Sequence, residues 1–199
     1  MKKIGLIILD GWGIGDGSKA DAVAQANTPF MDHLVATYPN ALLSACGEDV
    51  GLPEGQMGNS EVGHLNLGAG RIVYQELTRI NKSIKEGEFI TNKVLINAFE
   101  TVKKRKCKLH FIGLMSNGGV HSSDKHLHAL CAFAKQQGID HSYIHAFTDG
   151  RDCDPMSGIG FLKETDRICS PYGAKFASII GRYFAMDRDK RWERTKIAY

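Results

Sequence analysis

Leu109-His110-Phe111-Ile112-Gly113-Leu114-Met115 is the stretch that decides the fold of the C-terminal part of this 199-residue chain. It is short and mostly apolar, and a helical pattern and two further short apolar runs follow it. The predicted order is strand, helix, strand, helix, strand, over residues 109–115, 125–137, 142–147, 157–170 and 176–180. Because strands that alternate with helices form parallel sheets, the sequence predicts an α/β fold with a largely parallel sheet here.

Each of these three predicted strands ends in a polar loop that contains glycine. The loops are Ser116–His121, Thr148–Asp152 and Gly181–Asp189. Ligands of open α/β sheets bind beyond the carboxyl ends of the strands, so the loops should converge at one edge. They would present one imidazole, several carboxylates and three arginines, which suit phosphate and carboxylate oxygens. Any one of these groups also has an ordinary interpretation, such as a turn with a surface ion pair.

The N-terminal run Ile4–Leu9 is short and apolar, and it predicts a buried central strand. Asp10 follows it directly, in a glycine-rich stretch. A dinucleotide-binding fingerprint fails in both glycine registers, and an aspartyl-phosphate nucleophile would be expected to have a second Asp where Trp12 stands. A metal-binding carboxylate at a strand end and a plain turn aspartate remain.

Helices are predicted on either side of a second short strand. The first covers about 21–38 with a break and restart at Pro29, the strand covers Ala41–Cys46, and a glycine-rich loop follows over 48–58. Two further helices are predicted over 72–90 and 91–104.

The segment Gly58-Asn59-Ser60-Glu61-Val62-Gly63-His64 has the composition of an activated serine, with a hydroxyl between glycines and a carboxylate and an imidazole close by. Small neighbours allow close approach to the backbone, and a helix start favours anions. The hydrolase motif G-x-S-x-G does not fit, because Val62 occupies the place of its second glycine. A simple helix cap at Ser60 is the alternative.

The composition is that of a soluble globular protein, with 43% hydrophobic and 24% charged residues. The net charge of +3 is compatible with an anionic small molecule but too small for a nucleic-acid partner. Five cysteines without a C-x-x-C pair argue against a disulfide framework and favour a reduced, cytoplasmic setting. No apolar run is long enough for a membrane span.

Taken together, the motifs resemble those of the cofactor-independent phosphoglycerate mutases of the alkaline phosphatase superfamily. The matching segments, in the family's order and at about its spacing, are 9–13, 58–64, 116–122, 149–155 and 181–194. The family pattern S-D-G-G-V-H-S-H has Asn117 and Ser123 here, and Cys153 stands where the family has threonine.

This resemblance implies an α/β protein in two parts. Residues 1–75 would be the N-terminal part of an alkaline-phosphatase-like, metal-binding domain, and residues 76–199 the N-terminal part of an inserted transferase domain. It also implies interconversion of 3-phosphoglycerate and 2-phosphoglycerate through phosphoserine, with two Mn²⁺ ions and no 2,3-bisphosphoglycerate. The implied roles are Asp10 and Ser60 as metal ligands, Ser60 also as the catalytic nucleophile, and His121, Arg151, Asp152, Arg182 and Arg188 as substrate-binding residues.

The family's chains are much longer and monomeric, and their remaining metal ligands lie in the C-terminal half. We therefore expect these 199 residues to be the N-terminal portion of a mutase and to be inactive alone. Two alternatives are a metal-dependent phosphatase or phosphopentomutase of the same superfamily, and a non-catalytic remnant that binds phosphoglycerate weakly through its arginines.

Overall fold

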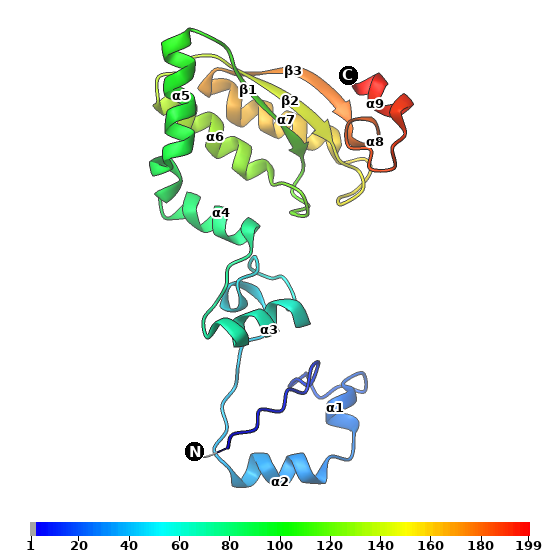
Figure 1. Ribbon diagram of the computed structural model, residues 1–199. Coiled ribbons are helices and arrows are strands. Elements are labelled where there is room, and N and C mark those ends of the chain that lie inside the picture. Colours follow the sequence, from blue (N-terminus) through cyan, green and yellow to red (C-terminus); the bar gives the residue numbers. More distant parts are fainter. Residues whose placement is uncertain (1–2) are drawn as a thin grey trace. The chain divides into compact units, whose positions relative to one another are not determined.

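The computed structural model describes residues 3–199, which divide into two compact units. The first unit ends at Gln75, and the second is Glu76–Tyr199 (Figure 1). Among residues 3–199, no helix has both the length and the apolar character needed to cross a bilayer.

The second unit is built on a parallel sheet of three strands in the order β1-β2-β3. The strands are β1 (Leu109–Met115), β2 (Ser142–Thr148) and β3 (Ala174–Gly181). Leu109 is paired with Ser142 and Met115 with Thr148, so β1 and β2 are in register along their whole length. The register between β2 and β3 shifts between Ile144 and His145. The predicted strand–helix alternation and the parallel sheet are confirmed.

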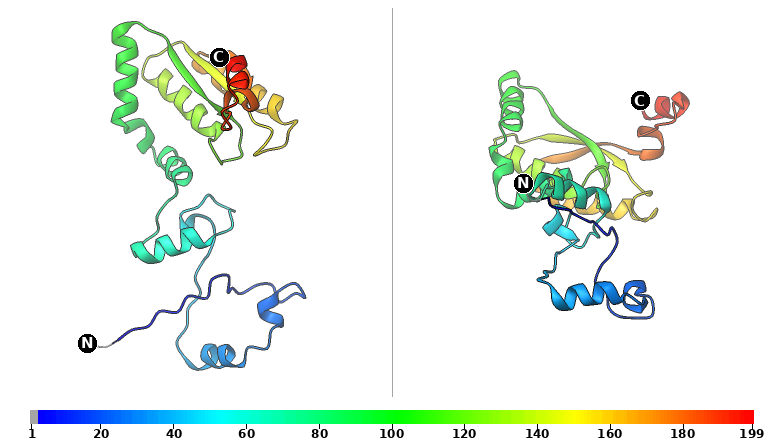
Figure 2. Two further views of the ribbon diagram at one scale, coloured as in Figure 1. Left: turned by 45° about the vertical axis from the view of Figure 1, so that its right-hand side comes forward. Right: turned by 60° about the horizontal axis from the view of Figure 1, so that its bottom comes forward.

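Two helices lie along the same face of this sheet, α6 (Asp124–Gln136) and α7 (Gly158–Cys169) (Figure 2). The core between the helices and the sheet consists of buried small and apolar residues from both layers. These are Met115, Cys131, Ile144, Ala146, Cys169 and Ala174. Burial of this apolar area is what holds the layers together, and it fixes the strand ends from which the polar loops emerge.

A second core joins α6 to the segment that precedes the sheet, which contains α4 (Glu76–Lys85), η2 (Glu88–Thr91) and α5 (Lys93–Arg105). The ring of Phe133 in α6 meets Phe99 of α5 edge-on at 5.1 Å and lies 6.3 Å from Phe89. The Asn92 side chain caps α5 by accepting from the N–H of Val94. The contacts of Phe133 fix α5 against α6, and the Asn92 cap stabilises the start of α5.

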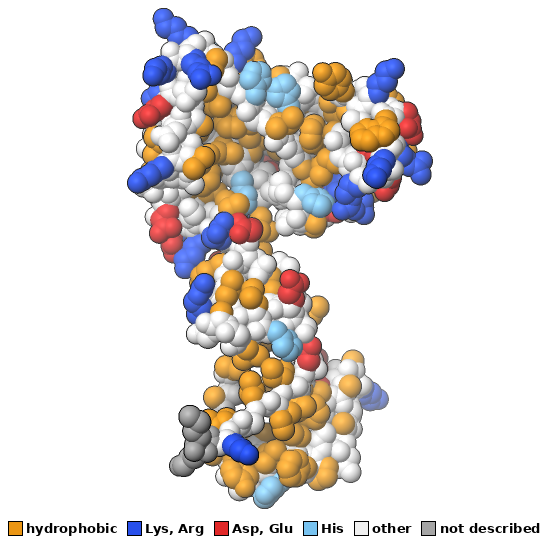
Figure 3. Space-filling view, in the orientation of Figure 1, with side chains coloured by type: hydrophobic (Ala, Val, Ile, Leu, Met, Phe, Trp, Pro, Cys, Tyr) orange, Lys and Arg blue, Asp and Glu red, His pale blue; other side chains and the backbone are white. Residues whose placement is uncertain are grey.

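After β3 the chain forms two short helices, α8 (Arg182–Ala185) and α9 (Trp192–Ala198). They pack against each other, and α8 also contacts the ends of β2 and β3. Charged side chains of both signs gather over α8 and α9 (Figure 3). The segment therefore brings charge to the carboxyl edge of the sheet.

The first unit contains α1 (Ala22–Gln25), α2 (Pro29–Thr37), η1 (Gly47–Val50) and α3 (Ser60–Ala69). The predicted break and restart at Pro29 is confirmed, because α1 ends before it and Pro29 is the first residue of α2. The Asn66 side chain joins α3 to the rest of the unit by donating to the carbonyl of Val50 and accepting from the N–H of Val73.

The two strands predicted in the first unit, Ile4–Leu9 and Ala41–Cys46, are wrong for this structure. Both segments are irregular, and the side chains of Ile4 and Ile7 are 93% and 85% exposed. A strand exists only through hydrogen bonds to a neighbouring strand, and within residues 3–199 the only sheet is β1-β2-β3 of the second unit. An apolar run without a pairing partner does not form a strand.

Candidate functional site

The loops that follow β1, β2 and β3 enclose an open pocket of about 750 Å³ at the carboxyl edge of the sheet. This is the convergence that a parallel topology requires. The lining residues are mostly charged: His121, Asp149, Gly150, Arg151, Gly181, Arg182, Tyr183, Met186, Asp187, Arg188, Asp189 and Arg194. Four predicted substrate-binding residues, His121, Arg151, Arg182 and Arg188, therefore line one cavity.

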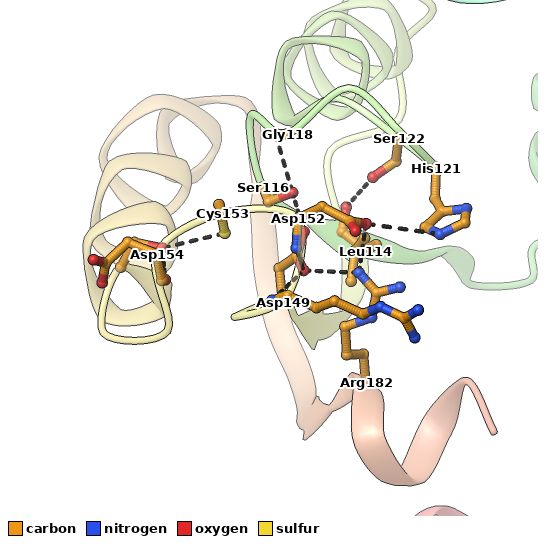
Figure 4. A network of polar contacts seen from close by, with 12 residues as sticks. Leu114, Ser116, Gly118, His121, Ser122, Asp149, Asp152, Cys153, Asp154 and Arg182 are labelled. Atoms are coloured by element: carbon orange, nitrogen blue, oxygen red, sulfur yellow. Dashed lines mark hydrogen bonds and ion pairs between the residues drawn. The ribbon is translucent and has the colours of Figure 1, made fainter.

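Arg182 lies at the start of α8, directly after β3, and bonds to two carboxylates of the loop that follows β2. Its Nη1 donates to Asp149 Oδ1 at 2.8 Å and to Asp152 Oδ2 at 2.6 Å (Figure 4). The side chains of Arg182, Asp149 and Asp152 are only 11%, 1% and 14% exposed. Short, charge-assisted bonds between groups with so little solvent access hold the guanidinium firmly.

Asp149 is the first residue after β2, and its carboxylate is the most heavily bonded group of the site. Oδ1 accepts from the N–H groups of Arg151 and Asp152, both at 3.0 Å, and Oδ2 accepts from Ser116 Oγ at 2.6 Å. Burial alone would raise the pKa of Asp149. The hydrogen bonds from Ser116, the two backbone N–H groups and Arg182 outweigh burial and hold this pKa well below its usual value. Asp149 is therefore ionised at neutral pH.

His121 approaches the same cluster from the loop after β1. Its Nε2 lies 3.7 Å from Asp152 Oδ2, which is an ion-pair distance if the ring is protonated but is too long for a hydrogen bond. Figure 4 shows the imidazole beside the Asp152 carboxylate and the Arg182 guanidinium. The three strand-end loops thus each contribute a charged or titratable group to one point.

Two other guanidinium groups of the pocket have no partner among residues 3–199. Arg151 and Arg188 are exposed, and neither guanidinium makes a hydrogen bond or an ion pair within the described part of the chain. Arg194 differs, because it stacks on the Tyr183 ring at 3.9 Å and lies 3.6 Å from Asp187 Oδ1. Arg151 and Arg188 are therefore free to bind an anion.

Ser60 and Asp10 both belong to the first unit. Ser60 is the first residue of α3, whose N-cap is Asn59, with the Asn59 side chain accepting from the N–H of Val62 at 2.9 Å. The helix cap expected as the alternative role of Ser60 is thus filled by its neighbour. The Ser60 hydroxyl is exposed at a helix N-terminus, where partial positive charge favours anions.

His64 lies one turn beyond Ser60 and bonds back to it. Its Nδ1 is 2.8 Å from the Ser60 carbonyl oxygen and 3.2 Å from Ser60 Oγ. A carbonyl oxygen only accepts, so Nδ1 carries the proton of the shorter bond and has no lone pair for the hydroxyl proton. In this arrangement His64 is not a general base for Ser60, and activation of the hydroxyl needs another group.

Asp10 lies in an exposed turn in which the Trp12 N–H donates to the Leu9 carbonyl. Its carboxylate makes no hydrogen bond within the described residues, so its oxygens are free for a cation. Residues 3–199 contain no group of three or more His, Cys, Asp or Glu side chains arranged to hold a metal ion. Asp10 and Ser60 supply oxygen donors of the kind that hard divalent cations prefer.

Gly58 sits where the backbone of another segment comes close, as expected for a glycine beside Ser60. A Cβ built at Gly58 would lie 1.8 Å from the Ala45 carbonyl oxygen, whereas one at Gly63 in α3 would meet nothing within 4 Å. We predict that Gly58→Ala destabilises the first unit by about 1–3 kcal/mol. Gly63→Ala should stabilise it by up to about 1 kcal/mol.

Urea unfolding checks this pair of variants, in a Trp192→Phe background so that fluorescence of Trp12 reports on the first unit. Equal midpoints for the two alanine variants would contradict the close approach at Gly58.

Residues 80–199, more than half of the chain, match the family model described as BPG-independent PGAM N-terminus (iPGM_N). The chain belongs to the BPG-independent phosphoglycerate mutase family. The resemblance expected from the motifs is confirmed.

Named relatives agree with this membership. A 2,3-bisphosphoglycerate-independent phosphoglycerate mutase of Bacteroides thetaiotaomicron is 55% identical over 198 residues, which are 100% of this chain and 39% of the relative. One of Methanosarcina acetivorans is 57% identical over 195 residues, or 98% and 38%. A crystal structure of Leishmania mexicana phosphoglycerate mutase at low cobalt concentration matches with a TM-score of 0.62 and 39% identity, covering 95% of this chain and 36% of that one. The chain thus spans about 39% of the length of the curated mutases it matches.

Two residues of the site were missed by sequence reasoning, Asp149 and Ser116. Ser116 directly follows a predicted strand and Asp149 lies two residues after the end of one, and that position was the available signal. Each has an ordinary alternative role in a turn, and only the structure shows that they bond to each other across 33 residues of sequence.

Proposed function

We propose that the chain is the N-terminal part of an enzyme that interconverts 3-phosphoglycerate and 2-phosphoglycerate through a phosphoserine at Ser60, without 2,3-bisphosphoglycerate. The proposal concerns a longer polypeptide, because the curated mutases it matches are longer than these 199 residues. In that polypeptide, residues 1–75 would be part of the phosphatase-like domain and residues 76–199 part of the transferase domain. The boundary between these two ranges coincides with the boundary between the two compact units.

The observation that carries this proposal is the pair of guanidinium groups, Arg151 and Arg188, that have no partner within residues 3–199 and line a pocket that also holds Arg182 and His121. Phosphoglycerate is a small anion with a phosphate at one end and a carboxylate at the other. The planar fork of an arginine matches both groups in charge and can bind two oxygens of either group with parallel hydrogen bonds. The pocket can therefore hold the glycerate at both ends while its hydroxyl groups exchange the phosphoryl group.

Ser60 and Asp10 supply the reacting hydroxyl and a cation ligand. A divalent cation, for which we propose Mn²⁺, would lower the pKa of the Ser60 hydroxyl and offset the charge of the incoming phosphoryl group. Both side chains fit this role, since they are exposed oxygen donors. The N-terminus of α3 adds a favourable field for phosphate on Ser60, and His64 keeps its Nδ1 proton on the Ser60 carbonyl.

The setting we propose is the cytoplasm, with small phosphoglycerates as ligands and a monomeric full-length enzyme. All five cysteines are free thiols, in keeping with a reducing compartment. The mutase identity of the relatives points to small-molecule substrates.

Titration of 3-phosphoglycerate into the 199-residue chain tests the proposal. We expect saturable binding that Arg188→Ala weakens by about tenfold, the loss typical of one hydrogen-bonded charged group. Arg167→Ala is the matched control, because Arg167 pairs with Glu164 on the exposed surface and does not line the pocket. Tighter binding of ribose 5-phosphate than of 3-phosphoglycerate would contradict the mutase assignment, as would identical effects of the two arginine substitutions.

A further inference from the structure

We propose that Asp149 is a positioning residue, which fixes the Arg182 guanidinium so that its free edge faces the anion in the pocket. The inference rests on the proposed function for the identity of the anion. The positioning itself follows from contacts within the second unit, and it can be measured without a ligand.

The Asp149 carboxylate joins all three strand-end loops. It accepts from Ser116 in the loop after β1, from the backbone of Arg151 and Asp152 in its own loop after β2, and from Arg182 after β3. Ser116 is itself buried, and its hydroxyl oxygen also accepts from the Gly118 N–H at 3.3 Å. A carboxylate bonded in this way has no freedom to move, so it can serve as a fixed reference for Arg182.

Only one side of the Arg182 guanidinium makes hydrogen bonds. Nη1 has two hydrogens, and they are used by Asp149 and Asp152. The remaining N–H groups, on Nε and Nη2, make no hydrogen bond with any residue of the described part of the chain. That second edge is the fork that binds carboxylate or phosphate with two parallel bonds. Fixing Nη1 therefore sets the direction of the unused fork.

The positioning role explains why a negatively charged residue, Asp149, is present in a pocket for anions. A carboxylate in a pocket for anions repels the ligand, so by Coulomb's law its removal should strengthen binding. Asp189 gives the comparison, because it lines the same pocket but is exposed and has no hydrogen-bond or ion-pair partner among residues 3–199. If Asp149 positions Arg182, loss of the two charges has opposite effects on binding.

The first arm of the test measures Arg182 directly, by ¹⁵N NMR of its guanidinium in the 199-residue chain without ligand. We expect slow rotation of the Arg182 guanidinium and resolved Nη signals in the unmodified chain and in Asp189→Asn. Asp149→Asn should speed the rotation by at least about tenfold, because a charge-assisted bond is replaced by a weaker neutral one. Unchanged rotation in Asp149→Asn overturns the positioning role, whether or not phosphoglycerate binds.

The second arm measures affinity for 3-phosphoglycerate by calorimetry. Asp149→Asn should weaken binding about tenfold although the pocket becomes more positive, and Asp189→Asn should leave it equal or tighter. Tighter binding by both variants overturns the proposal. Absence of binding by the unmodified chain contradicts the proposed function instead, and the NMR arm then decides the positioning role.

Ser116→Ala keeps the test valid if Asp149→Asn does not fold. This change removes the donor to Asp149 Oδ2 and leaves every charge in place, so electrostatics alone predicts no change in affinity. We expect faster Arg182 rotation and about threefold weaker binding, since one hydrogen bond is lost. Wild-type values for both quantities in a folded Ser116→Ala chain would overturn the proposal.

Discussion

Arg182→Ala is expected to destabilise the second unit by about 3–5 kcal/mol at neutral pH, the usual cost of removing one partner from a buried ion pair. The substitution leaves the carboxylates of Asp149 and Asp152 without their shared cation, in a place where they are only 1% and 14% exposed. The two carboxylates also face each other across the vacated space.

The same variant should be less destabilised in acid, and the sign follows from the pKa of Asp149. In the unmodified protein this pKa lies below the ordinary value of 3.8. A depressed pKa contributes stability that is present above pH 3.8 and is lost as the pH falls below it. Without Arg182 one cause of the depression is gone, so protonation of Asp149 relieves the buried charge at higher pH. The stability curves of the two proteins should therefore approach each other as the pH falls below 3.8.

Urea unfolding at a series of pH values from about 7 to about 2.5, followed by the NMR signals of β1, β2 and β3 amides, measures both effects. Arg167→Ala is again the matched control, because its exposed pair with Glu164 should contribute less than about 1 kcal/mol. An equal loss of stability at every pH in this series would show that the effect of Arg182 does not come from the buried carboxylates.

The fold of the second unit could be predicted from sequence because its partners are close along the chain. Each strand pairs with the next strand in sequence, so a local pattern of apolar runs and helices contains the information that the sheet needs. The strand predicted at Ile4–Leu9 failed for the opposite reason. Its apolar pattern is equally clear, but no strand within residues 3–199 pairs with it.

For the candidate site, the positions of the residues could be predicted from the sequence. Strand-end position was enough to place His121, Arg151 and Arg182 at one edge, because a parallel topology brings such ends together. The bonding between them was not predictable. Asp149 receives bonds from residues 33 positions away on either side, and the letters Asp-Gly-Arg-Asp alone are equally typical of a surface turn.

Phe133→Ala should destabilise the second unit by about 3–5 kcal/mol, the range for a fully buried aromatic residue. The Phe133 side chain is 2% exposed and lies between α6 and α5, where it contacts Phe99 edge-on. Its loss opens a cavity that backbone movement can fill only in part. Trp192→Ala is the control for loss of an aromatic ring, since Trp192 is 71% exposed and should change stability by less than about 0.5 kcal/mol.

A double-mutant cycle between Phe133 and Phe99 separates ring–ring contact from burial. If the edge-on contact at 5.1 Å is favourable in itself, the double alanine variant should lose about 0.5–1.5 kcal/mol less than the sum of the single variants. Urea unfolding of the four proteins measures this coupling. Strict additivity would mean that α5 is held to α6 by burial alone, and the orientation of the two rings would then contribute nothing to the attachment of α5.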